Sequence, residues 1–171
     1  MEKLWSPWRS NYIESFKTKK ETDDCVFCEA HKTQFEADES LVVFKSELCY
    51  VMLNLYPYNS GHLLIIPYRH QSDMTSLTDA EMDEMMRMVQ LSIKALNIAI
   101  KPQGFNFGAN LGKAAGAGID SHLHFHIVPR WSGDINFMPA IGEVKIISQD
   151  LLATKKNLIN AFEQLINKKR E

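Results

Sequence analysis

Short runs of apolar and β-branched residues, separated by polar and turn-forming residues, dominate the first half of the chain. They cover residues 41–44, 49–54 and 62–67, and the segment Tyr-Pro-Tyr-Asn-Ser-Gly at 56–61 separates the last two. Such runs bounded by Pro, Asn, Ser and Gly are typical of β-strands joined by turns. The sequence therefore predicts three consecutive strands that form an antiparallel meander.

A helical period follows these strands. Thr78-Asp79-Ala80-Glu81 has the spacing of a capping box, in which Thr and Glu side chains bond to backbone N–H groups at a helix start. Beyond it, apolar residues recur at helical spacing over 82–100, and Pro102 and Gly104 end the pattern. We expect one long amphipathic helix whose methionines fill a core.

The second half of the chain predicts further strands and a second helix. Residues 105–111 have the composition of a strand, and 112–118 follow as a loop of small residues. In 122–128, three histidines alternate with Leu, Phe and Ile at the period of a strand. A last helix begins at Ser148 or Asp150 and has one apolar face. These elements predict the α+β fold class, with helices packed against an antiparallel sheet.

Length and charge exclude several classes of protein. The chain has 171 residues, 45% of them hydrophobic, which suits a single domain over 1–171 with a sizeable core. The formal net charge of −2 gives no polyanion-binding signature, and we interpret Lys17, Lys19 and Lys20 as a solvated basic cluster. No segment approaches the roughly twenty apolar residues of a membrane span, and the start lacks the apolar core of a signal peptide. We expect a cytoplasmic protein with no membrane or nucleic-acid partner.

The alternating histidines are the strongest chemical signal in the sequence. Successive side chains on a strand point to opposite faces, so His122, His124 and His126 share one face while the apolar residues between them enter a core. Packing alone does not explain three imidazoles in register, since leucine or valine would serve a core better. The sequence therefore predicts a reactive site on this face, beside the loop 112–118.

Two features near this site allow more than one interpretation. Gly116-Ala117-Gly118 can be a simple turn, or it can cradle phosphate with backbone N–H groups. The three histidines can bind a catalytic metal, but Asp120 lies before the strand and no nearby acid is positioned as a base. An uncharged imidazole can instead attack phosphorus and form a covalent intermediate, which is the chemistry we favour.

The histidines, followed by Val-Pro-Arg-Trp, match the motif of the histidine triad (HIT) family of nucleotide-binding hydrolases and transferases. Asn54–Pro57 and Gly61–Pro67 resemble the family's nucleoside-binding strand pair. Leu4–Arg9, Asn110–Gly112 and Pro129–Asp134 resemble a bacterial branch related to diadenosine tetraphosphate phosphorylases. The resemblance implies a single HIT domain with about five antiparallel strands, a homodimer, and nucleotidyl transfer from dinucleoside polyphosphates or related conjugates of an adenine nucleotide.

Four histidines carry catalysis in this interpretation. His124 would attack phosphorus, directed by a backbone carbonyl that accepts from its other ring nitrogen. His126 would donate to phosphate oxygens, and the resemblance implies that His62 supports His122, His124 and His126 from a neighbouring strand. Many relatives carry a hydroxyl residue in the preceding loop, where this chain has Gly118-Ile119. That difference keeps open the alternative of a nucleotide-binding scaffold protein with little turnover.

Five positions are expected to bind the nucleotide. The resemblance implies that Asn54 contacts the ribose diol and that Asn110 contacts the phosphate or the bridging oxygen. Backbone groups at Gly116 and Gly118 would assist, and Trp131 would contact the leaving part of a longer substrate. The alternatives are a turn residue for Asn54 and a core aromatic for Trp131.

The pair Cys25-Val26-Phe27-Cys28 predicts a second site. Two thiolates at this spacing can hold one side of a tetrahedral zinc ion, which needs two more ligands. His31 is a local candidate, whereas the resemblance to zinc-bearing relatives implies His70 and His122. We expect a structural zinc site at Cys25, Cys28, His70 and His122, within an N-terminal extension over 1–30, and no organic cofactor. Two reduced cysteines or a redox pair are the alternatives.

Overall fold

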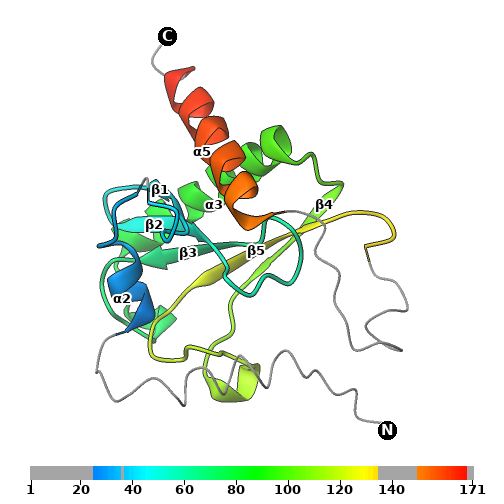
Figure 1. Ribbon diagram of the computed structural model, residues 1–171. Helices are drawn as coiled ribbons and strands as arrows, with labels where there is room; N and C mark the ends of the chain where they lie inside the picture. The colour runs from blue at the N-terminus through cyan, green and yellow to red at the C-terminus, as the bar shows by residue number, and fades with distance from the viewer. Residues whose placement is uncertain (1–24, 36, 135–149, 169–171) are drawn as a thin grey trace, which may run out of the picture.

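The computed structural model describes residues 25–35, 37–134 and 150–168 (Figure 1). Within these ranges the strands are β1 (Val42–Lys45), β2 (Cys49–Leu53), β3 (Leu63–Pro67), β4 (Gly104–Gly108) and β5 (Phe125–Arg130). The α-helices are α2 (Val26–Ala30), α3 (Asp79–Ala99) and α5 (Leu151–Asn167), and short 3-10 turns cover Met74–Ser76 and Lys113–Ala115. The lysine cluster at 17–20, the motif at 4–9 and Ser148 lie outside the described residues.

The five strands form one antiparallel sheet in the order β1-β2-β3-β5-β4. The first three strands make the predicted meander, and the α+β class with about five strands is confirmed. β3 lies at the centre, where Leu64 pairs with Met52 of β2 on one side and with His126 of β5 on the other. This register brings the turn before β3 next to the histidine segment.

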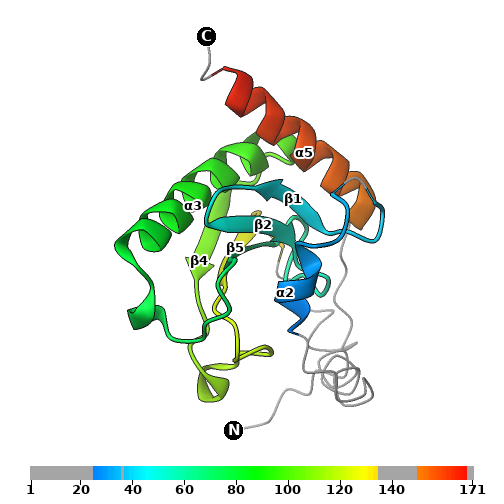
Figure 2. The ribbon, with the colours of Figure 1, turned by 90° about the vertical axis from the view of Figure 1, so that its left-hand side faces the viewer.

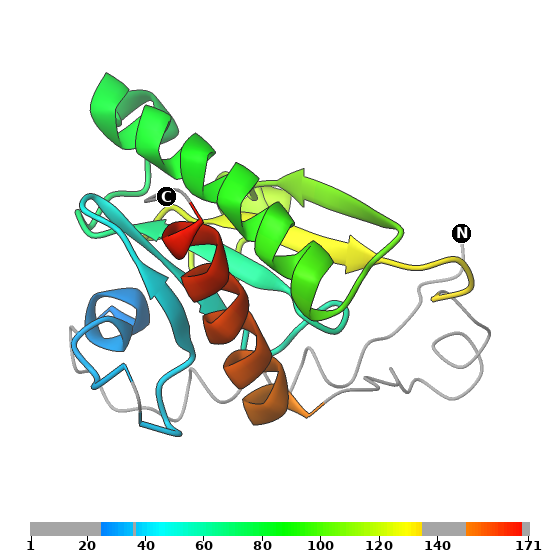
Figure 3. The same cartoon turned by 90° about the horizontal axis from the view of Figure 1, so that it is seen from above.

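Both long helices begin at side-chain caps and cover one face of the sheet (Figures 2 and 3). The capping box at α3 is present: Glu81 N–H donates to the Thr78 hydroxyl over 3.2 Å, and the Glu81 carboxylate accepts from Thr78 N–H over 2.8 Å. At α5, the Asp150 carboxylate accepts from Ala153 N–H over 2.8 Å. Both helix starts therefore follow from local sequence, as expected.

The sheet buries side chains on both faces, which explains why β2 and β3 are apolar at every position. Odd-numbered residues of these strands, such as Leu63 and Ile65, pack under α3 and α5. Even-numbered residues of the strands pack with Phe27 under α2 and form a second core. Its buried members are Phe27, Val42, Tyr50, Met52, Leu64 and Ile66.

The histidine segment differs from the prediction at its ends. β5 begins at Phe125 and extends through Arg130, so His122 and His124 precede the ladder. Leu123 N–H donates instead to the carbonyl of Gln71, outside the sheet. The alternation still holds, because Leu123, Phe125 and Ile127 are buried in the core on the α3 side. Among the described helices, none has the length and hydropathy needed to cross a bilayer.

Candidate active site

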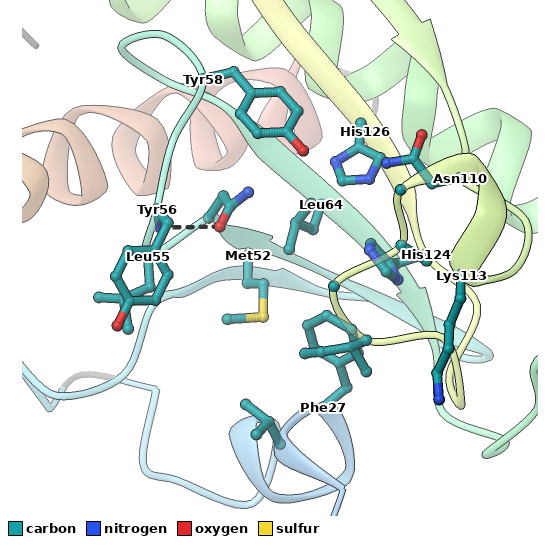
Figure 4. A pocket seen from close by; sticks show the side chains of 16 residues that line it. Phe27, Met52, Leu55, Tyr56, Tyr58, Leu64, Asn110, Lys113, His124 and His126 are labelled. Atoms are coloured by element: carbon teal, nitrogen blue, oxygen red, sulfur yellow. Dashed lines mark hydrogen bonds between the residues drawn. The ribbon is translucent and has the colours of Figure 1, made fainter. Parts of the chain in front are cut away.

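A cavity of about 400 Å³ lies on the sheet face opposite α3 and α5 (Figure 4). Its wall is formed by α2, by the ends of β2 and β3, by the segment after β4 and by the histidine segment. The lining residues are Val26, Phe27, Met52, Asn54, Leu55, Tyr56, Tyr58, Leu64, Asn110, Lys113, Gly116, Ala117, Gly118, Ile119, His124 and His126. The volume and the mostly apolar wall suit a small organic ligand.

The two ends of the cavity differ in chemistry. Figure 4 shows His124, His126, Asn110 and Lys113 gathered on one side, with Leu55, Tyr56 and Met52 on the other. The cavity therefore has a polar end and an apolar end, an arrangement that suits a molecule with the same asymmetry, such as a nucleotide.

Hydrogen bonds fix the position of the proton on His62 and His126. Tyr58 N–H, which can only donate, lies 3.0 Å from His62 Nδ1, so that nitrogen is the acceptor. With Nδ1 as the acceptor, the donor nitrogen of the His62 ring is Nε2, which lies 3.0 Å from His126 Nδ1. His126 Nδ1 accepts in turn, so the proton of His126 is on Nε2. That buried nitrogen has no hydrogen-bond partner among the described residues.

The proton on His124 is fixed by one backbone group. His124 Nδ1 lies 2.9 Å from the carbonyl oxygen of His122, which can only accept. Nδ1 therefore carries the proton, and Nε2 keeps its lone pair. The rings of His124 and His126 are adjacent, with 4.8 Å between their centroids. The polar end of the cavity thus offers a nucleophilic nitrogen next to an N–H donor.

Both rings are uncharged at neutral pH. Burial lowers the pKa of His126 to about 4, and repulsion from His124 adds to the effect. Burial also lowers the pKa of His124, although the bond to the His122 carbonyl opposes that shift. A neutral His124 keeps the lone pair that an attack on phosphorus requires.

A group of four metal-binding side chains lies next to this cavity. One ligand atom from each of Cys25, Cys28, His70 and His122 falls within 4.8 Å of the others. His122 Nδ1 is 3.3 Å from Cys25 Sγ and 3.6 Å from Cys28 Sγ, and His70 Nδ1 is 3.3 Å from Cys28 Sγ. Zinc bonds to sulfur and nitrogen imply tetrahedral edges of about 3.5 Å, so this geometry fits the ion.

The surroundings of these four side chains also favour a cation. His122 Nε2 lies 2.9 Å from the carbonyl oxygen of Pro67, so it donates there and leaves the Nδ1 lone pair facing the cysteines. Burial, followed by the interaction with Cys25, raises the pKa of the Cys28 thiol. Two thiolate sulfur atoms within 4.8 Å of each other repel, and a bound cation would remove that repulsion.

The alternative metal arrangements are not formed. His31 lies against Tyr68 and Tyr50, with ring centroids 4.9 and 5.6 Å away, and is outside the four-residue group. Within the described ranges, His122, His124 and His126 do not form a metal-binding group with one another. His122 serves the cysteine site, whereas the other two histidines line the cavity.

The predicted nucleotide-binding residues lie mostly around the cavity. Asn54, Asn110, Gly116 and Gly118 all line it. The Asn54 side chain also accepts from Tyr56 N–H over 3.0 Å, so it has the turn role that was the alternative. The contact of Asn54 with a ribose diol stays a prediction. The turn role does not exclude it, because the carboxamide has further hydrogen-bonding capacity.

Trp131 lies outside the cavity lining, and its motif has a structural role. The Asp134 carboxylate accepts from Trp131 N–H over 3.1 Å and forms two 2.7 Å bonds with the Arg130 guanidinium. Asn59 donates to the same carboxylate over 2.8 Å and to the Pro129 carbonyl over 3.0 Å. This network ties the end of β5 to the turn before β3. The contact between Trp131 and a substrate stays a prediction.

The sequence interpretation missed several residues of the site, among them Tyr58, Phe27 and Lys113. Tyr58 contributes its backbone N–H to His62, Phe27 lies 4.9 Å from His124 between ring centroids, and Lys113 lines the polar end of the cavity. Lys113 follows Asn110-Leu111-Gly112, which was assigned to the site, so its position in the sequence was a usable signal. The other two carry no such signal, because their roles depend on packing and main-chain geometry.

Comparison with known proteins agrees with this geometry. Residues 35–133 match the HIT domain. A Mycobacterium tuberculosis protein named AP-4-A phosphorylase is 42% identical over 161 residues, which cover 92% of this chain and 83% of the relative. A structure of a zinc-bound histidine triad family protein from Mycobacterium smegmatis is 25% identical, with a TM-score of 0.68 over 85% of this chain and 97% of the other.

A third comparison extends the fold relationship. The diadenosine triphosphate hydrolase of Plasmodium falciparum superimposes with a TM-score of 0.60 over 94% of this chain and 97% of its own, at 19% identity. This likeness shows the fold alone. The domain match covers more than half of the chain, and the mycobacterial relative extends the match over most of the rest. The chain therefore belongs to the HIT family of nucleotide-processing enzymes.

Proposed function

We propose that this enzyme transfers a nucleotidyl group from a dinucleoside polyphosphate of the diadenosine tetraphosphate type to inorganic phosphate or water. The transfer proceeds through a covalent bond to His124 Nε2. One observation carries the proposal: the lone pair of His124 Nε2 lies beside the donor N–H of His126 at the polar end of the cavity. The M. tuberculosis relative named AP-4-A phosphorylase supports this substrate class.

In the first step, His124 Nε2 attacks the phosphorus of the bound nucleotidyl group. A P–N bond forms, and the bond from phosphorus to the bridging oxygen breaks, so that the rest of the polyphosphate leaves with the electron pair. His126 Nε2–H donates to a phosphate oxygen as negative charge develops. The substituted imidazole of His124 gains positive charge, which the carbonyl of His122 stabilises through Nδ1–H.

In the second step, an oxygen of the acceptor attacks the same phosphorus. A P–O bond forms, the P–N bond breaks, and its electron pair returns to His124 Nε2. Phosphate as the acceptor gives a nucleoside diphosphate, whereas water gives a nucleoside monophosphate and one proton. The enzyme is restored in both cases, with no change of oxidation state.

The apolar end of the cavity suits the nucleoside. Leu55 and Tyr56 have exposed apolar surface there, with Met52 beside them, and a purine ring would cover that surface. Asn54, whose carboxamide accepts from Tyr56 N–H and lies 3.3 Å from His62 Nδ1, would bond the ribose diol. We propose adenine as the base, by analogy with the relative's name.

The test is incubation of the wild-type enzyme and His124→Ala with diadenosine tetraphosphate, with and without inorganic phosphate, and separation of the products. Phosphate-dependent ADP and ATP indicate phosphorolysis, and AMP and ATP without phosphate indicate hydrolysis. Either activity must disappear in His124→Ala, while circular dichroism shows that the variant is folded. Undiminished product formation by the variant would contradict the proposed nucleophile.

A nucleotide-binding scaffold protein is the second candidate. The loop before the histidines contributes Gly118 and Ile119 to the cavity and no hydroxyl group at these positions. Nucleotide binding by calorimetry without any product, across dinucleotide and phosphoramidate substrates, would favour this candidate.

We also propose that the four-residue group holds a structural zinc ion. Cys25, Cys28, His70 and His122 would be its ligands, and the ion would fix α2 against the histidine segment without acting on substrate. Metal analysis of protein purified without added metal should give one zinc per chain. Cys28→Ser should lower that content, and Cys49→Ser, which alters a cysteine outside the group, should not. Folded wild-type protein without zinc would contradict the proposal.

The homodimer and the cytoplasmic location stay predictions. Sedimentation of the full chain at several concentrations tests the first, and cell fractionation tests the second. A concentration-independent monomer would contradict the dimer.

A further inference from the structure

Among the described residues, few groups at the polar end of the cavity can neutralise a polyphosphate. A dinucleoside polyphosphate carries several negative charges, whereas His124 and His126 contribute a lone pair and one N–H. The loop after β4 was expected to add backbone donors. Its own turn uses several of them: Ala115 and Ala117 N–H donate to the Gly112 carbonyl, and Gly116 N–H donates to the Lys113 carbonyl. A basic side chain at this end of the cavity would supply the missing neutralisation.

Lys113 is the candidate for that charge. Among the described residues that line the cavity, it is the one with a basic amine side chain. It lies on the same side of the cavity as His124 and His126 (Figure 4). The flanking residues Gly112 and Gly116 adopt φ values of 81° and 89°, so the short turn that presents Lys113 has a defined backbone.

The ion pair between Lys113 and Asp120 is weak enough for another anion to replace Asp120. Its Nζ lies 3.8 Å from an Asp120 carboxylate oxygen, and the two side chains are 83% and 39% exposed. Exposed pairs at this distance contribute little to stability, because water screens them. A phosphate group can therefore replace Asp120 as the partner at small cost.

We propose that Lys113 binds the phosphate groups beyond the one that His124 attacks, and afterwards binds the incoming inorganic phosphate. This inference rests on the proposed function and takes phosphate, in preference to water, as the acceptor. In an in-line displacement, the leaving group departs opposite the attacking nitrogen. The acceptor must then attack from the side opposite the same nitrogen. The leaving polyphosphate and the acceptor therefore occupy the same position in the cavity. A cation there serves the leaving polyphosphate in the first step and the acceptor phosphate in the second.

Asp120 opposes this role. Its carboxylate competes with phosphate for Lys113 and repels an incoming anion. Its removal should therefore strengthen phosphate binding, whereas removal of Lys113 should weaken it. Opposite effects from two exposed residues of one ion pair are not expected from a structural role.

The experiment measures the KM for inorganic phosphate and the ratio of ADP to AMP formed from diadenosine tetraphosphate. Lys113→Gln should raise the KM for phosphate about tenfold and shift the products toward AMP. Lys113→Arg should restore most of the wild-type ratio, and Asp120→Asn should lower the KM for phosphate about threefold. Lys94→Gln, which removes a charge from the exposed face of α3, is the matched control and should change neither quantity.

A second measurement does not depend on turnover. Calorimetry of diadenosine tetraphosphate binding to His124→Ala and to His124→Ala combined with Lys113→Gln should show about tenfold weaker binding in the double variant. Normal turnover with an unchanged KM and product ratio in Lys113→Gln overturns the inference alone. Absence of turnover in wild-type protein refutes the proposed function, and the calorimetric difference then decides whether Lys113 binds phosphate.

Discussion

The ring of Phe27 lies against the imidazole of His124, with 4.9 Å between the ring centroids and 54° between the planes. Phe27 is 4% exposed, and its carbonyl accepts from the buried Tyr50 hydroxyl over 2.7 Å. It also lies between Cys25 and Cys28 in the sequence. The short helix α2 therefore joins the four-residue metal-binding group to the cavity wall and to the nucleophile.

Phe27 should act on the rate rather than on metal content. Phe27→Leu keeps an apolar side chain but removes the ring that confines His124, so we expect kcat to fall about tenfold. Val26→Ala is the comparison, because Val26 lines the cavity on the same helix, and it should change mainly KM. Steady-state kinetics and metal analysis check both variants. An unchanged kcat in Phe27→Leu would show that the ring does not position His124.

Metal removal should weaken nucleotide binding. If the proposed zinc ion holds α2 through the two sulfur atoms and His122, its removal should loosen the wall formed by Val26 and Phe27. We expect a chelator to lower both the affinity for AMP and the temperature of unfolding, and added zinc to restore them. Calorimetry and thermal denaturation measure these effects. Identical AMP affinity in metal-free and zinc-loaded protein would show that metal binding does not affect nucleotide binding.

We expect His62 to affect kcat because it holds the proton of His126 on Nε2. His62→Ala removes the donor to His126 Nδ1, so the proton of His126 is no longer held on Nε2. We expect kcat to fall about tenfold or more, with a smaller change in KM. His62→Gln can still donate from its carboxamide and should retain more activity than the alanine variant. Equal loss in both would argue for a packing role of this buried residue.

Gly61 should tolerate no side chain. Its φ is 74°, and a Cβ atom there would lie 2.5 Å from Ile100 Cδ1 and 3.2 Å from Leu96 Cδ2. Gly61→Ala should therefore cost at least about 1–2 kcal/mol in the free energy of unfolding. Gly104→Ala is the control, since a Cβ there meets no atom within 4 Å. Urea denaturation compares the two, and equal stability would mean that the turn rearranges freely.

The ion pair at the start of α3 should make stability depend on acid pH. Arg69 donates to both Glu81 oxygens over 2.8 and 2.7 Å, which lowers the pKa of Glu81 from 4.5 to about 2. The unfolded chain then takes up a proton at higher pH than the folded one. The stability from this pair is full above about pH 4.5 and is lost as the pH falls toward 2.

Glu81→Gln tests that dependence. The variant should be less stable at pH 7 and should lose less stability between pH 5 and pH 3 than the wild type. Asp83→Asn, on the same helix, should keep the wild-type slope because Glu81 is still present. Urea denaturation across this range gives the free energies, and equal slopes for Glu81→Gln and wild type would contradict the assignment.

The sequence predicted those parts of the molecule that depend on local pattern. The alternation at 122–128 predicted which side chains of that segment face the core, because successive side chains of an extended segment point to opposite sides. The capping residues Thr78 and Asp150 marked the helix starts, since the caps bond to the next turn. The start of β5 was misplaced, because it depends on Leu123 bonding to Gln71, about fifty residues away in the chain.

The candidate site was predicted as a set of residues, and its chemistry was only partly predictable. Cys25 and Cys28 came from their spacing, His70 and His122 came from the resemblance, and the structure brings these side chains together. Which nitrogen of each imidazole carries the proton depends on main-chain atoms of Tyr58, His122 and Pro67. No residue type in the sequence encodes those contacts, since every residue has a backbone.

That dependence on main-chain atoms has an evolutionary consequence. An amide N–H survives every substitution except proline, and a carbonyl survives all of them. The donor at Tyr58 and the acceptors at His122 and Pro67 are therefore insulated from most point mutations. Lineages can then vary the cavity wall and change substrate preference while the arrangement of acid and nucleophile is inherited with the fold itself.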